Sequence, residues 1–229
     1  MAEEYLTDDE QWEAIKRGAV EYAPWIIGGV LVGAALFFGI RYYQNYNNQR
    51  AYAAATQFGA MTNALEANDH ARSRQIAEGL IKDYAESPYA DQARLTLARL
   101  DVDDGQDQNA VATLTQVMND SKDADLRQIA RLRLARVLTD QGKPDEAIKT
   151  LAAPEPPAFV ARYHEVRGDA LLVKKDVAGA IGEYQAALGA ADATGVDAAL
   201  LELKIQDLGA APAPVLKAIP SDTSNKAKP

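Results

Sequence analysis

The longest run of hydrophobic positions lies near the N-terminus, where residues Ala23–Ile40 contain no charged side chain. At about 1.5 Å per helical residue, these 18 residues reach about 27 Å, close to the thickness of a bilayer's hydrocarbon core. Aromatic residues of the kind found at membrane interfaces stand near both ends of the run: Tyr22, Trp25, Tyr42, Tyr43 and Tyr46. The pattern predicts a single transmembrane helix over residues 23–43.

A cleaved signal peptide and a buried core helix are the two alternatives for this run. A signal peptide carries a basic segment before its apolar core, whereas seven acidic residues precede Ala23 against only Lys16 and Arg17. Core helices of soluble proteins rarely run this long without one polar residue. We therefore expect a retained membrane anchor.

Residues 1–22 form an acidic segment ahead of the anchor. Within it Trp12, Ile15, Ala19 and Val20 recur near one helical face, a pattern typical of a short amphipathic helix that lies on a membrane surface. A polar leader with chance periodicity is the alternative.

The basic residues that flank the anchor do not determine its orientation. Lys16 and Arg17 precede the anchor, and Arg41 and Arg50 follow it, so the two sides carry equal numbers. The positive-inside rule therefore favours neither topology.

Small residues within the anchor stand four positions apart. Gly29 and Gly33 form a G-x-x-x-G pair, and Ala35 and Gly39 repeat the spacing. Such spacing lets a second helix approach closely in lipid. Gly29 and Gly33 are therefore the candidate helix-packing residues, although glycine is common in transmembrane helices in any case.

Beyond the anchor, residues 44–208 are rich in Ala, Leu, Arg, Glu and Gln, which favours helices. Turn-forming clusters divide this segment into helices of roughly 10 to 18 residues. These clusters are Asn68-Asp69, Ser87-Pro88, Asp104-Gly105, Gly142–Pro144, Pro154–Pro157 and Lys175-Asp176.

The helices repeat in pairs. In three units, two small residues stand twelve positions apart: Ala98 and Ala110, Ala135 and Ala147, and Gly168 and Ala180. A large residue follows four positions after the second small one: Leu114, Leu151 and Tyr184. The units start 37 and 33 residues apart, on either side of the tetratricopeptide period. Small residues let paired helices cross closely, and several pairs must stack to bury their apolar faces.

The ends of the repeat segment are less regular. We expect Ala53–Glu66 to pair with Arg74–Tyr84 around Ala77 and Ile81, and a helix over Val196–Leu208 to cap the stack. The predicted fold class is all-α, with one transmembrane helix followed by a tetratricopeptide-like α-solenoid of about four helix pairs plus the capping helix. Residues 209–229 are rich in proline and alanine, so we expect a disordered tail.

Composition limits the possible functions. Beyond Ile40 the chain carries 22 basic and 26 acidic residues, a net charge of −4, which argues against nucleic-acid binding. It has no cysteine, and its two histidines, His70 and His164, are far apart, which argues against thiol chemistry and multi-histidine metal sites. Phosphate-loop and dinucleotide-binding motifs are missing. We predict no catalytic, cofactor-binding or metal-binding residue, no small-molecule substrate and no enzyme activity.

Five segments follow one another in a specific order, although each is ordinary by itself. They are Gln11–Arg17 before the anchor, Arg41–Tyr43 directly after it, and then Leu132–Val137, Arg167–Leu172 and Lys204–Leu208. In this order the chain resembles the YfgM-type ancillary subunits of the bacterial Sec translocon over about residues 8–208. The proline-rich tail after Ala210 departs from the pattern of that family.

The resemblance implies a single-pass protein of the cell inner membrane with a cytoplasmic N-terminus and a periplasmic repeat domain. It also implies three protein partners: the SecYEG channel, a membrane-anchored periplasmic chaperone of the PpiD type, and translocating chains. The implied role is to help newly translocated chains reach periplasmic folding factors. The alternative is a membrane-anchored repeat scaffold for another envelope assembly complex.

Stacked helix pairs present a concave groove that binds segments of partner proteins. With Ala98, Ala135 and Gly168 as position 8 of each unit, positions 2, 9 and 13 face this groove. The candidate polar residues there are Gln92, Arg99, Asp103, Arg136, Asp140, Arg162 and Asp169, and Ile129 and Val173 complete the set. The Lys/Asn set of cytosolic chaperone adaptors is missing, and simple solvation is the alternative for each polar residue.

Overall fold

The computed structural model describes residues 8–152, 156–190 and 195–210. Every regular element in these ranges is helical, which confirms the predicted all-α class. The elements are α1 (Asp8–Glu66), α2 (His70–Asp83), α3 (Pro88–Asp103), α4 (Asp107–Asp120), α5 (Ala124–Asp140), α6 (Pro144–Thr150), the 3-10 helix η1 (Pro157–Phe159), α7 (Val160–Val173), α8 (Val177–Gly189) and α9 (Ala198–Asp207).

The chain divides into two compact units, residues 1–56 and residues 57–229. The first contains the N-terminal part of α1, and the second contains the end of α1 and all later helices. Helix α1 has no break at residues 22–23 or 43–44. The predicted ends of the transmembrane segment at these residues are therefore not marked in the fold and stay predictions. The prediction of a disordered tail concerns residues that, from 211 onward, lie outside the described ranges.

The part of α1 in the first unit exposes its large apolar side chains. Phe38 is 68% exposed and Leu31 is 65% exposed, and the neighbouring large apolar side chains of α1 are exposed to similar extents. Among the described residues, one helix is long and apolar enough to cross a membrane, and none of its most apolar stretch is buried in the protein. A helix with this surface is not the core helix of a soluble domain. It is a candidate membrane span.

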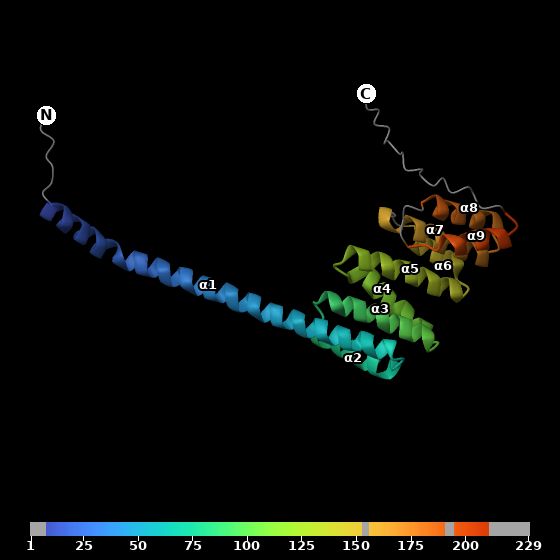
Figure 1. The fold of residues 1–229 in the computed structure, drawn as a ribbon, viewed down its shortest axis with the longest axis horizontal. Helices are drawn as coiled ribbons and strands as arrows, with labels where there is room; N and C mark the ends of the chain where they lie inside the picture. Colours follow the sequence, from blue (N-terminus) through green and yellow to red (C-terminus); the bar gives the residue numbers. More distant parts are fainter. Residues whose placement is uncertain (1–7, 153–155, 191–194, 211–229) are drawn as a thin grey trace, which may run out of the picture. The chain divides into compact units, whose positions relative to one another are not determined.

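The second unit is a stack of helix pairs in chain order (Figure 1). The end of α1 pairs with α2, α3 with α4, α5 with α6, and α7 with α8, while α9 packs on α8. The small residues that the sequence places at the crossing points are all buried, as are Leu114, Leu151 and Tyr184. The predicted pairing of these three units is therefore confirmed.

One turn geometry recurs at the end of the first helix of each of the four pairs and again at the end of α9. The residue in the left-handed conformation is Asn68, Gly105, Gly142, Lys175 or Gly209, spaced by 37, 37, 33 and 34 residues. In each turn this residue's amide donates to the carbonyl three residues earlier, and the next amide donates to the carbonyl five residues earlier. These are the bonds of the Schellman motif, which satisfy carbonyls left open at a helix end.

The recurring turn extends the repeat beyond the three units visible in the sequence. Counting back seven residues from Asn68 gives Met61, and twelve residues after Met61 comes Ser73. Both are buried, and the Ser73 hydroxyl donates to the Met61 carbonyl at 3.2 Å. The first pair therefore follows the common register, with Met61 and Ser73 in place of small apolar residues. Ala77 lies in its core as expected, and Ile81 packs at the edge.

Three local features differ from the sequence-based expectation. Ser121–Asp123 separates α4 from α5, a break that the sequence analysis missed, and the Asp123 carboxylate accepts hydrogen bonds from the first amides of α5. Helix α6 has only seven residues, fewer than expected. Helix α9 ends in the same turn as the first helices of the pairs, so it occupies a first-helix position.

Gly168 lies where α7 and α8 approach most closely. A Cβ atom at Gly168 would lie 2.5 Å from Cε1 of Tyr184 and 2.7 Å from its Cδ1. The Tyr184 ring is fully buried, and its hydroxyl donates to Asp169 at 2.7 Å. The ring is therefore held in place and cannot move aside at low cost.

We expect Gly168→Ala to lower the free energy of unfolding by about 1–3 kcal/mol, because it overpacks this crossing. Thermal unfolding of the full-length protein in detergent, followed by circular dichroism, measures the effect as a lower Tm. Gly182→Ala is the matched control: Gly182 is exposed on α8 and no atom lies within 4 Å of an added Cβ. That variant should melt at or above the wild-type Tm, since alanine favours helix. A Gly168→Ala protein that melts no lower than wild type contradicts the tight crossing.

Candidate functional site

Four of the predicted groove residues on α3 and α5 lie at the surface. Arg99, Asp103, Arg136 and Asp140 are all exposed, and the Arg99 side chain retains 66% of its accessible area. The ion pairs they make are long. Arg99 Nε lies 3.8 Å from a carboxylate oxygen of Asp103, and Arg136 Nη2 lies 3.4 Å from Glu165 of α7. These side chains are therefore weakly held and open to a partner.

A third arginine, Arg133, belongs to the same surface. Its guanidinium donates to the backbone carbonyl of Leu95 at 3.2 Å, which ties α5 to α3. Burial of the guanidinium, together with the nearby charges of Arg99 and Arg136, lowers the pKa of Arg133 below its usual value. The sequence analysis missed Arg133, although its position three residues before Arg136 places both on one face of α5.

Asp169, another predicted groove residue, holds α9 against the last pair. Its carboxylate accepts a hydrogen bond from the Tyr184 hydroxyl at 2.7 Å and pairs with Lys204 of α9 at 2.6 Å. The Lys204 ammonium also lies 5.2 Å from the centre of the Tyr184 ring. Burial and the bond to Asp169 raise the pKa of Tyr184, so the hydroxyl remains a donor. Asp169 has a structural role here.

Arg162 and Gln92 are also less available than Arg99 or Arg136. Arg162 Nε donates to the Gly195 carbonyl at 3.0 Å, and its guanidinium lies 6.0 Å from the centre of the Phe159 ring. Gln92 is partly buried on α3. The structure thus brings Arg99 and Arg136 together on neighbouring helices, while Arg162 and Asp169 make contacts within the C-terminal part of the stack.

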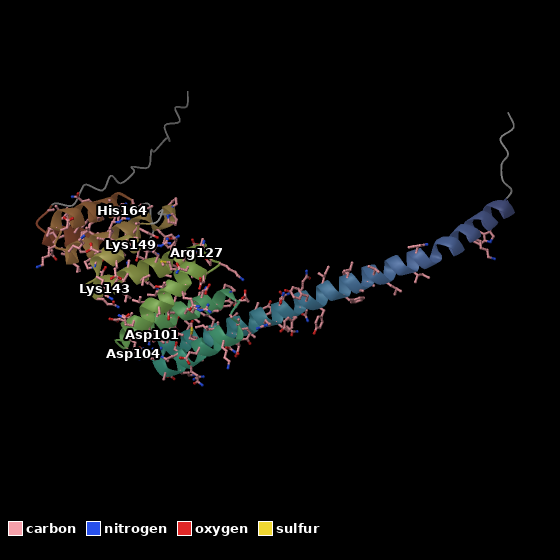
Figure 2. The ribbon with its side chains drawn as sticks, turned by 180° about the vertical axis from the view of Figure 1, so that it is seen from behind. Asp101, Asp104, Arg127, Lys143, Lys149 and His164 are labelled. Atoms are coloured by element: carbon pink, nitrogen blue, oxygen red, sulfur yellow. The ribbon has the colours of Figure 1, made fainter. Side chains whose placement is uncertain are left out.

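Other charged groups join neighbouring helices of the stack. Arg74 of α2 pairs with Asp101 of α3 at 2.6 Å and with Asp104, the residue that caps the C-terminal end of α3, at 2.8 Å (both aspartates are labelled in Figure 2). Hydrogen bonding to Asp101 is the largest of the influences that raise the pKa of Arg74. His164 of α7 lies 2.7 Å from Glu183 of α8, so it sits between the two helices of the last pair (His164 is labelled in Figure 2). These contacts stabilise the stack.

The acidic and histidine side chains of the described residues are the groups whose arrangement decides whether a metal ion can be held. Over these ranges no three His, Asp or Glu side chains gather in a way that could hold a metal ion. The titratable clusters found there are ion pairs within or between helices.

On the anchor, Gly29 and Gly33 are exposed, and no atom outside their own helix lies within 4 Å of an added Cβ at either position. Gly28 has equally open surroundings. A hollow nearby is lined by Ala35 and Gly39 among others. The helix-packing role of Gly29 and Gly33 stays a prediction.

A family model described as a tetratricopeptide repeat-like domain matches residues 20–210 of the chain. The match includes both the candidate membrane span and every helix pair. A protein of Escherichia coli (strain K12) named ancillary SecYEG translocon subunit is 31% identical over 206 residues, which cover 89% of this chain and 98% of that protein. The chain belongs to the YfgM-type family of tetratricopeptide repeat-like proteins.

Membership of the YfgM-type family agrees with the resemblance drawn from the sequence segments. No solved structure matches the chain. The helix arrangement described above therefore rests on the turns, helix crossings and ion pairs of this chain.

The different roles of Asp169 and Asp140 can be separated by substitution. Asp169→Asn removes the charge that faces Lys204, and we expect α9 to detach more readily, by about 1–2 kcal/mol. Hydrogen exchange measured by mass spectrometry should show about tenfold faster exchange of α9 amides. Asp140→Asn, on the exposed end of α5, should leave α9 protected. Equal protection of α9 in both variants contradicts the structural role of Asp169.

Proposed function

We propose that this protein is a non-catalytic ancillary subunit of the Sec translocon. The observation that carries the proposal is the extent of its likeness to the E. coli subunit, since 98% of that protein corresponds to this chain at 31% identity. The likeness is thus not confined to one common repeat.

The proposed location is the inner membrane, with the N-terminus in the cytoplasm and the repeat domain in the periplasm. The exposed apolar surface of α1 supports a membrane span. The flanking basic residues leave orientation open, so the orientation follows from the family alone. A domain without cysteine needs no disulfide to fold in an oxidising compartment.

The proposed activity is binding of partner chaperones of the PpiD type and of newly translocated chains, which are then handed to periplasmic folding factors. Stacked helix pairs suit this role because their first helices expose adjacent surfaces along the stack. In this protein Arg99 on α3 and Arg136 on α5 occupy equivalent positions in successive repeats, so one extended chain can contact both.

The anchor has a second proposed role as a contact with another membrane helix of the translocon. Gly29 and Gly33 lie on one face of α1 and leave its backbone open to close approach. Close backbone contact is a main source of helix association in lipid, where burial of apolar side chains gives no net gain.

Topology is tested with a reporter enzyme that is active only in the periplasm. Fused after Leu208, the reporter should be active, because the repeat domain should follow the anchor out of the cytoplasm. The same reporter fused before Trp12 should be inactive and serves as the control. An inactive fusion after Leu208, in cells where the protein accumulates normally, places the repeats in the cytoplasm and refutes the proposed location.

Association with the translocon is tested by affinity purification of the tagged full-length protein from gently solubilised membranes. SecY should co-purify with the wild type, and Gly33→Leu should reduce its recovery by about tenfold, since a large side chain blocks close helix approach. Gly28→Leu is the matched control, because Gly28 lies about 140° around the helix from Gly33. Its recovery of SecY should equal that of wild type.

Two outcomes refute parts of the translocon proposal. Wild-type protein that recovers neither SecY nor a PpiD-like chaperone favours a scaffold for another envelope complex. Equal recovery of SecY with Gly33→Leu and Gly28→Leu refutes the glycine contact and leaves the translocon association standing.

A further inference from the structure

Three guanidinium groups gather on the surface of the second and third repeats. We define the arginine face as Arg99 of α3 together with Arg133 and Arg136 of α5. Arg99 and Arg136 are 37 residues apart, the same interval that separates the two turns following them. Equivalent positions on adjacent stacked helices lie side by side, and the hydrogen bond from Arg133 to Leu95 brings the third group between the helices.

The carboxylates of the protein compensate this cluster incompletely. Two ion pairs elsewhere in the stack are short: Arg74 to Asp101 and Lys204 to Asp169 both measure 2.6 Å. On the arginine face the pairs lengthen to 3.8 Å for Arg99 and 3.4 Å for Arg136. The charges that act on Arg133 are those of the other two arginines, and both oppose its protonation.

An incompletely compensated cationic cluster is notable in a chain whose net charge is −9. Like charges held close together raise the energy of the unbound protein. A carboxylate from a partner lowers it, because an arginine fork can donate two hydrogen bonds to one carboxylate. The arginine face can therefore accept further carboxylates beyond Asp103 and Glu165, which lie 3.8 Å and 3.4 Å from its guanidinium groups.

We infer that the arginine face binds an acidic, extended segment of a partner protein. The inference rests on the proposed function, in which the repeat domain binds protein chains, and it adds the charge of the segment that is bound. The carboxylates of an extended chain can reach each guanidinium separately while its backbone spans α3 and α5.

The local charge pattern favours a peptide over a membrane surface. Asp103 and Asp140 follow Arg99 and Arg136 by one helical turn and are exposed. A flat anionic bilayer that met the arginines would also meet these two aspartates, and repulsion would offset the attraction. A single chain can pass over the arginines and avoid the aspartates.

The inference is tested with the full-length protein in discs of phosphatidylcholine and a short fluorescent peptide with evenly spaced glutamates. Fluorescence anisotropy should show binding that weakens as salt rises, and a glutamine version of the peptide should bind at least about tenfold more weakly. Arg133→Gln should weaken binding of the glutamate peptide by about tenfold, the loss expected for one charged hydrogen bond.

Matched variants separate binding from folding. Arg72→Gln removes an exposed arginine of α2 outside the arginine face and should bind the peptide as wild type does. Arg133→Gln should keep the wild-type Tm within a few degrees, since it removes repulsion along with one hydrogen bond. Arg133→Glu should lose the glutamate peptide and gain affinity for a lysine version, a reversal that general destabilisation does not produce.

Four results overturn the inference. They are equal affinity for the glutamate and glutamine peptides, unchanged binding by Arg133→Gln, an equal loss with Arg72→Gln, and abolition of peptide binding when the discs contain phosphatidylglycerol. The last of these assigns the arginine face to anionic lipid. SecY recovery remains a separate measurement: its absence with wild-type protein refutes the translocon role, whereas peptide binding tests only the arginine face.

Discussion

The close crossing of two helices at small buried residues is the contact on which the repeat domain depends. The recurring turn sets this crossing. In each pair the first crossing residue lies a constant number of positions before the left-handed residue of the turn, and the second crossing residue lies a constant number of positions after it. Where the side chain at the crossing is largest, as at Met61, the partner is Ser73, whose hydroxyl bonds to the backbone of the first helix. Where it is absent, at Gly168, an aromatic ring fills the space. The geometry is thus constant while the residues vary.

This packing determines which side chains are free to act. The residues at the crossing positions are buried in the core. The positions next to them on α3, α5 and α7 recur on one surface of successive repeats. In the middle of the stack they carry Arg99 and Arg136, which reach solvent. In the last pair the equivalent position carries Asp169, and its pairing with Lys204 and Tyr184 closes the stack. One register position therefore carries an exposed arginine in two repeats and a carboxylate that binds a neighbouring helix in a third.

The sequence predicted an element correctly where a local pattern of residues had one physical explanation. An uncharged run long enough to span lipid predicts the anchor, and paired small residues at a constant interval predict three of the helix pairs. The register of the first pair was hidden because Met61, Asn68 and Ser73 replace the more usual small residues and glycine. The roles of Arg133 and Asp169 were hidden for another reason. Their neighbours come from helices far away in the chain, and the reach of a long side chain across helices does not follow from periodicity.

Because each helix contacts mainly its neighbours along the stack, the domain behaves as a row of linked units. Loosening at one end need not spread to the other, since α2 packs on α3 at one end of the stack and α8 packs on α7 and α9 at the other. The hydrogen bond from Arg133 to Leu95 lies across one internal junction of this row. A chain bound over that junction would stabilise the two central repeats against local unfolding. The terminal repeats would still unfold locally as before. Binding of a chain to the arginine face and rigidity of the two central repeats would then change together.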